Sequence, residues 1–247
     1  MHDDDVVARR RPGGTRTSSS RLIALLLVPV AFAVVACGGD DSPATTTTAR
    51  SSTSSTTTGA PATQPDTAVW PFASSTTRFR DPVAAATSFA VTFLGFVDPV
   101  VGGFQQGDTR SGEVPVRANP GGPVTTVLVR QVTTDDSWWV LGASTPNLQI
   151  ETPSTPATIS SPVTLSGRST AFEATVNVQV RQDDTLTPLQ EGTVMGGANG
   201  QMAPFSTDLS FPAPTAAAGA IVLMTLSAEN GHVAEASVIR VHFAPPR

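Results

Sequence analysis

The sequence predicts a mainly β protein, with an antiparallel β-sandwich of about 100 residues at the C-terminal end and a small α+β domain before it. Two observations lead to this fold class. Apolar residues alternate with polar ones in several segments after residue 147, and turn-forming residues separate these segments. One helical pattern, near residues 82–94, precedes them. We therefore expect four segments: 1–36, 37–65, 66–146 and 147–247.

Residues 1–36 have the order of a secretory signal. Five arginines come first, and the 15-residue apolar run Leu22 to Ala36 follows. This run is shorter than the roughly 20 residues that a membrane span needs. The sequence Val34-Val35-Ala36-Cys37 resembles the lipobox of bacterial lipoproteins, and Cys37 is the only cysteine of the chain.

The lipobox resemblance implies cleavage before Cys37 and a diacylglyceryl group on its sulfur. Two acyl chains give stable anchoring where one gives only marginal binding, so this implies attachment to the outer face of the cytoplasmic membrane. The alternative is an ordinary secretory signal followed by an unmodified cysteine. Lipidation would leave no thiol for a disulfide, a metal site or a nucleophile.

Residues 37–65 are predicted to form a disordered tether. Between Ser42 and Thr58, 13 of 17 residues are Ser or Thr, and none of the apolar residues is larger than Ala. Such a segment cannot bury enough surface to offset its chain entropy. Thr/Ser-rich stalks are also frequent substrates of O-glycosylation.

Residues 66–146 are predicted to form one helix packed on a three-stranded meander. Asp81-Pro82 is a helix start signal, apolar residues recur at helical spacing to Leu94, and Gly95 can end the helix. Strands are expected at 113–118, 124–132 and 137–143.

Trp138 and Trp139 are the candidate binding residues of this domain. Successive strand residues point to opposite faces, so one ring should lie in the core and the other should face solvent, a second layer or a partner. Two interpretations stay open: both rings pack inside the protein, or they form a surface that stacks on carbohydrate or peptide.

Residues 147–247 are predicted to form the sandwich from about seven strands. Phe172 to Val180 alternate with polar residues, which places Phe172 on the core face and Glu173 on the polar face, within reach of Arg168, Arg181 or Arg240. Further strands are expected at 148–151, 163–168, 189–195 and 205–211. The last two, 221–228 and 233–243, flank Asn230-Gly231, the preferred type I′ turn.

A family resemblance accompanies this pattern. The segments Ser161 to Arg168, Ala171 to Ala174, Pro204-Phe205 and Ser227 to Gly231 resemble the immunoglobulin-like domain named after bacterial spore germination proteins. The resemblance covers about residues 148–244 and implies an immunoglobulin-like sandwich in an exported module. Such modules also occur in envelope lipoproteins, so the resemblance does not imply sporulation.

Composition and motifs argue against several activities. The chain has a net charge of −5, which disfavours nucleic-acid binding. After the predicted signal, His232 and His242 are the only histidines, and no catalytic or metal-binding spacing includes them. The pairs Asp135-Asp136 and Asp183-Asp184 fall in expected turns. We predict no enzyme, no cofactor and no metal site.

Three functions remain in competition. The first is a non-catalytic envelope lipoprotein that binds cell-wall polymer or another exported protein. The second is a small-ligand or lipid carrier, with an apolar pocket in residues 66–146 lined by Phe89, Phe93 and Trp139. The third is a cell-wall-modifying enzyme with two carboxylates in a cleft. The first is the prediction adopted here.

Overall fold

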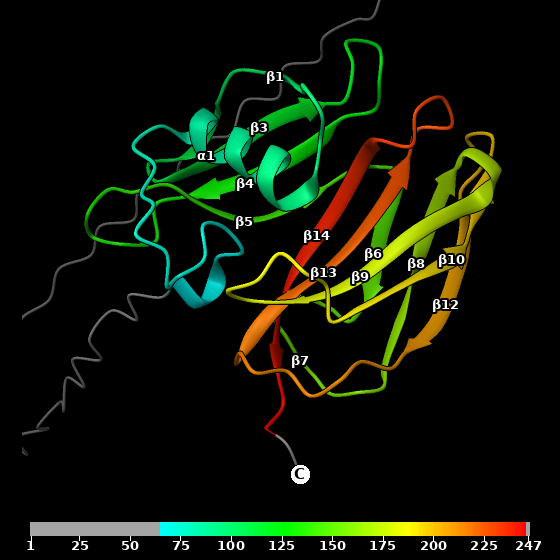
Figure 1. Ribbon diagram of the computed structural model, residues 1–247. Helices are drawn as coiled ribbons and strands as arrows, with labels where there is room; N and C mark the ends of the chain where they lie inside the picture. The colour runs from blue at the N-terminus through cyan, green and yellow to red at the C-terminus, as the bar shows by residue number, and fades with distance from the viewer. Residues whose placement is uncertain (1–64, 246–247) are drawn as a thin grey trace, which may run out of the picture. The chain divides into compact units, whose positions relative to one another are not determined.

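The structure is a computed structural model that describes residues 65–245 (Figure 1). The predicted signal, Cys37 and the predicted tether up to residue 64 lie outside the described residues. The helical elements are η1 (Pro65–Thr67), α1 (Pro82–Ser88), η2 (Phe89–Leu94) and η3 (Phe172–Ala174). The strands are β1 (Val100–Val101), β2 (Gln105–Asp108), β3 (Ser111–Arg117), β4 (Thr125–Arg130), β5 (Trp139–Ser144), β6 (Leu148–Thr152), β7 (Ala157–Ile159), β8 (Val163–Ala171), β9 (Thr175–Gln182), β10 (Gln190–Met195), β11 (Gly197–Ala198), β12 (Ala203–Leu209), β13 (Ala218–Leu226) and β14 (Val233–Phe243).

The helix begins and ends where the sequence predicts. The Asp81 carboxylate accepts a hydrogen bond from the backbone N–H of Ala84 at 2.7 Å, and Pro82 occupies the first turn. Gly95 closes the helix in the left-handed conformation, with φ of 83°. The second half, η2, is π-helical, which the apolar spacing did not predict.

The strands of this region form the predicted meander. β3 pairs with β4 and β4 with β5, all antiparallel. Two short strands were missed: β1 and β2 both pair with β3. The helix packs on one face of the meander (Figure 1). Apolar side chains of α1 and η2 belong to the same buried core as Val114, Val127 and Val140.

The meander continues into the sheet of the C-terminal region. The larger sheet has the order β1-β3-β4-β5-β14-β13-β9-β10. β5 and β14 join through the pairing of Val238 with Ala143. Gly142 permits this close approach, because a Cβ there would lie 2.5 Å from the carbonyl oxygen of Val238. The predicted domain boundary between residues 146 and 147 falls in the turn from β5 to β6, and it stays a prediction.

The central strands β13 and β14 are buried on both faces. Ala220, Val222 and Met224 face the core beneath the helix, together with Ala236 and Val238 of β14. Ile221 and Leu223 face the opposite way, into the core of the sandwich. One pair of strands therefore belongs to two hydrophobic cores, which agrees with the unbroken apolar run from Ala220 to Met224.

The second layer of the sandwich is formed by β6, β8, β12 and β11. β8 pairs antiparallel with β6 and β12, and parallel with β11. Leu165, Val178 and Phe205 are among the residues that fill the space between the layers. The antiparallel sandwich predicted from the sequence is confirmed. β7 and β11 were not predicted, because each has three residues or fewer.

The prediction that Phe172 faces the core is wrong. β8 continues to Ala171, and Phe172–Ala174 form a turn instead of the start of β9. Glu173 and Ala174 have positive φ angles of 56° and 60°, and the Phe172 side chain is 65% exposed. Glu173 therefore lies in this turn and not on the polar face of β9. The ion pairs of the described residues include none between Glu173 and Arg168, Arg181 or Arg240, the arginines that the predicted strand placed within reach.

The hairpin between β13 and β14 is present, but its predicted turn type is wrong. A type I′ turn needs positive φ at both central residues. Gly231 has a φ of 73°, whereas Asn230 is not among the residues of positive φ. Instead, the backbone N–H of Ser227 bonds to His232 at 2.8 Å and closes a four-residue loop.

Candidate binding sites

Trp139 lies in the interior, where its side chain is 1% exposed. Its indole N–H donates to the hydroxyl of Thr133 at 3.2 Å, and the guanidinium of Arg78 lies 4.9 Å from the ring centroid. A ligand could stack on this ring only if neighbouring side chains moved.

Trp138 lies on the face where the helix packs, and it is only partly buried. The rings of Trp138 and Phe104 form a T-shaped pair with a centroid separation of 5.1 Å and an interplanar angle of 68°. Its backbone N–H donates to Phe79 at 2.8 Å, which holds the strand in position. The stacking role of this pair of tryptophans stays a prediction, and Trp138 is the residue whose surface is open to it.

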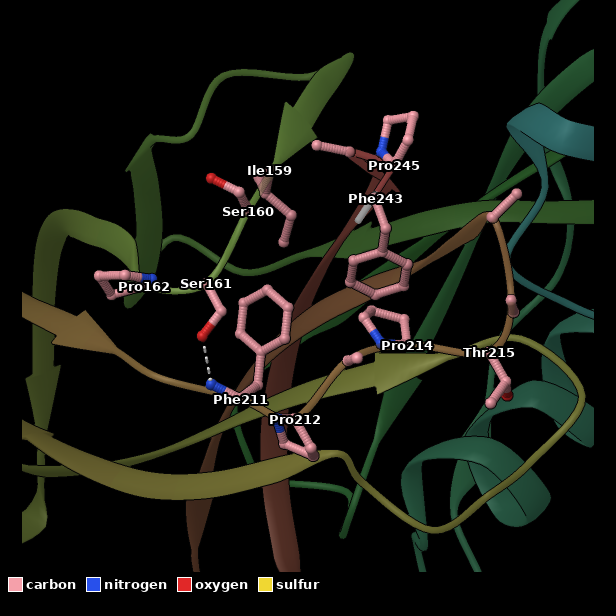
Figure 2. A pocket seen from close by; sticks show the side chains of 14 residues that line it. Ile159, Ser160, Ser161, Pro162, Phe211, Pro212, Pro214, Thr215, Phe243 and Pro245 are labelled. Atoms are coloured by element: carbon pink, nitrogen blue, oxygen red, sulfur yellow. Dashed lines mark hydrogen bonds between the residues drawn. The ribbon is translucent and has the colours of Figure 1, made fainter. Parts of the chain in front are cut away.

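A groove at one end of the sandwich, which we call the proline groove, has a volume of about 860 Å³ (Figure 2). Three segments line it: 159–162 at the end of β7, 211–217 between β12 and β13, and 243–245 at the end of β14. The rings of Phe211 and Phe243 lie 5.8 Å apart at an angle of 58°. The Ser161 hydroxyl accepts from the Phe211 N–H at 2.9 Å and fixes the wall (Figure 2).

The proline groove offers a stiff, mainly apolar surface. Pro162, Pro212, Pro214 and Pro245 are among its lining residues, and proline restricts the backbone before any ligand arrives. Its hydroxyl groups come from Ser160, Ser161 and Thr215, and no charged residue lines it. Such a surface suits binding through shape and apolar contact, and it holds no group for acid–base catalysis.

A second cavity, which we call the loop-end cavity, has a volume of about 740 Å³ and lies at the other end of β14. Its lining consists of Val97, Ala118, Asn119, Ala171, Phe172, residues 225–230 and residues 232–235. Val97, Phe172 and Leu226 are exposed large apolar residues, and all three lie on its wall. Exposed apolar side chains that gather around one cavity indicate a contact surface.

Glu235 lies in the wall of the loop-end cavity and is 4% exposed. Its carboxylate accepts from the hydroxyl of Thr145 at 2.5 Å, from the amide of Asn147 at 3.1 and 3.3 Å, and from the hydroxyl of Thr225 at 3.5 Å. Burial raises the pKa of Glu235 above its ordinary value, and the hydrogen bonds from these three residues partly oppose that increase. No pattern in the sequence indicates this group, because Thr145 and Asn147 lie about 90 residues before Glu235 in the chain.

The carrier and enzyme hypotheses gain no support from these cavities. Phe89 and Phe93 are stacked on each other with centroids 5.1 Å apart, and neither they nor Trp139 line either cavity.

Asp135 is a turn residue, as expected, and its carboxylate accepts a hydrogen bond from the Ser137 N–H. The hydrogen bond from the Thr133 hydroxyl is the main reason why the pKa of Asp135 falls to about 2. Residues 65–245 contain no group of three acidic, histidine or cysteine side chains placed to hold a metal.

Residues 147–232 match the family described as the immunoglobulin-like domain of bacterial spore germination. The match extends from the turn before β6 to the loop before β14, and it confirms the resemblance seen in the sequence. The searches of curated proteins and of solved structures returned no match. Within residues 65–245, no helix is long and apolar enough to cross a membrane.

Residues 147–232 are therefore similar to a domain family whose fold is non-catalytic. A domain of this type indicates a binding or structural module. The match does not extend to residues 65–146, which contribute the helix and the meander.

Proposed function

We propose that the protein is a non-catalytic lipoprotein, anchored through Cys37 to the outer face of the cytoplasmic membrane, whose folded part binds cell-wall polymer or another exported protein. The observation that carries the proposal is the match of residues 147–232 to an immunoglobulin-like domain family, in a chain whose residues 34–37 resemble a lipobox. The stiff proline groove and the partly buried Trp138 are surfaces on which an extended polymer could lie.

The anchor is tested by replacing Cys37 with alanine in the full chain. We expect the protein to move from the membrane fraction to the soluble exported fraction, because the acyl chains supply the binding energy, at roughly 0.8 kcal/mol per buried methylene. Fractionation followed by immunoblotting measures this change. The neighbouring substitution Gly39→Ala is the matched control and should leave the protein in the membrane fraction. Retention of the Cys37→Ala protein there would contradict the anchor.

Wall binding is tested by co-sedimentation of the full chain, in detergent, with purified cell-wall sacculi. We expect saturable binding that weakens about three- to tenfold in Trp138→Ala, which is the usual size of an aromatic contact. Met195→Ala, which removes an exposed apolar side chain elsewhere, is the control. If sacculi do not bind the protein at all, wall polymer is excluded and the partner is sought among exported proteins by crosslinking in cells.

A further inference from the structure

The chain contains two Asn-Gly dipeptides, the sequence in which asparagine loses its side-chain amide most readily. They are Asn199-Gly200 and Asn230-Gly231. The backbone nitrogen of the next residue can attack the side-chain amide carbon, and a glycine has no side chain to hinder this attack. All four residues are exposed, and a Cβ at either glycine would have no neighbouring atom within 4 Å. Sequence and exposure therefore do not distinguish the two sites.

Hydrogen bonds hold both reacting groups of Asn230-Gly231. The Gly231 N–H donates to the Ser227 carbonyl at 2.8 Å, so the proton that the attacking nitrogen must lose is already bonded. The side-chain oxygen Oδ1 of Asn230 accepts from the His232 N–H at 3.0 Å, which holds the amide in one orientation. Both bonds have to open before the Gly231 nitrogen can attack Cγ of Asn230.

The reacting groups of Asn199-Gly200 are not held in this way. The dipeptide lies in the turn between β11 and β12, and both residues have positive φ, 54° and 78°, as a type I′ turn requires. The Gln201 N–H closes the turn on the Ala198 carbonyl at 2.9 Å. None of the hydrogen bonds within residues 65–245 includes the Asn199 side chain or the Gly200 N–H. The bond that closes the turn therefore leaves the nucleophile and the amide free.

We propose that Asn199 is the deamidation site of the folded protein and that the fold protects Asn230. The Gly200 nitrogen forms a bond to Cγ of Asn199, the Cγ–Nδ2 bond breaks, and Nδ2 leaves as ammonia with the Gly200 proton. Water then opens the resulting succinimide at either carbonyl and gives aspartate or isoaspartate. The turn gains one negative charge, and the proposal does not depend on the anchor or on wall binding.

Peptide-mapping mass spectrometry of the full chain, kept in detergent at mildly alkaline pH, measures acid formation at each asparagine over time. In folded protein we expect Asn199 to react about tenfold faster than Asn230, because two hydrogen bonds have to open first at Asn230. In urea the two rates should become similar, since both dipeptides are then unrestrained. Asn147 and Asn177, which precede leucine and valine, are controls in the same chain and should react more slowly than both in urea.

Three results would overturn the proposal. They are similar rates at the two sites in folded protein, faster reaction at Asn230, and a preference for Asn199 that persists unchanged in urea. The last result would assign the difference to the neighbouring sequence and not to the fold.

Two matched variants check the assignment by a second measurement, the release of ammonia from folded protein. Asn199→Ser removes the reactive amide from an exposed turn and should lower the release about tenfold. Asn230→Ser removes the protected amide and should lower it little. An equal decrease in both variants would contradict the proposed difference between the sites.

Discussion

Replacing Arg240 by alanine is expected to lower the free energy of unfolding by about 3–5 kcal/mol, the usual cost of breaking a buried ion pair. Nη1 and Nη2 of Arg240 bind the two carboxylate oxygens of Asp183 at 2.6 and 2.7 Å, and the two side chains are only 5% and 18% exposed. Nε donates to the Asp66 carbonyl at 2.7 Å. The substitution leaves the Asp183 carboxylate poorly solvated and without this partner.

Urea unfolding of the full chain, followed by tryptophan fluorescence, measures this loss. Arg130→Ala is the matched control, because Arg130 pairs with Asp108 at 3.4 Å but both side chains are about half exposed. Exposed pairs contribute about 0–1 kcal/mol, so the control should change the unfolding midpoint little. An equal loss from both variants would show that the Arg240 pair does not have the strength expected of a buried one.

Replacing Phe89 by alanine is expected to cost a similar amount, about 3–5 kcal/mol, because it opens a cavity in a fully packed core. Phe89 has no exposed surface, stacks on Phe93, and belongs to the core that includes Val222 of β13. Since β13 belongs to both cores, we expect one cooperative unfolding transition at a lower midpoint.

The control for Phe89 is Val91→Ala in the same helical segment, where the side chain is exposed and the expected change is within about 0.5 kcal/mol. Unfolding in two separate steps would contradict the inference that β13 couples the two cores. The helix and meander would then lose structure while the sandwich stayed folded.

The elements that the sequence predicted well are those with strong local signals. β14 begins and ends at the expected residues, and the Asp81 cap and Gly95 stop define the helix. The turn at Phe172–Ala174 carries no such signal, because positive φ angles in Glu and Ala are uncommon and neither residue marks a turn. Alternation therefore extended the strand through Phe172 and placed that residue in the core.

The surroundings of the candidate site residues could not be predicted, because they consist of contacts between segments that lie far apart in the sequence. Arg181 occupies a polar position of an alternating strand, yet its side chain is buried, donates to the Phe93 carbonyl and packs on the Phe93 ring at 4.7 Å. Alternation assigns such residues to solvent because it does not show that η2 covers that face. In the sequence, Glu235 likewise has the position of an ordinary polar strand residue. Only the fold places Thr145 and Asn147 beside it, where both donate hydrogen bonds to its carboxylate.

The way the chain enters the folded part determines how it bears mechanical load. The Asp66 carbonyl accepts a hydrogen bond from Arg240 of β14. The backbone N–H groups of Val69 and Trp70 donate to the carbonyl of Val140 in β5, and the Val140 N–H donates to the Trp70 carbonyl. Tension applied at residue 65 therefore passes directly into two neighbouring strands in the middle of the larger sheet, rather than into a peripheral hairpin. Under the proposed anchoring, pulling between membrane and partner would be resisted first by β5 and β14, two largely buried strands inside the larger sheet.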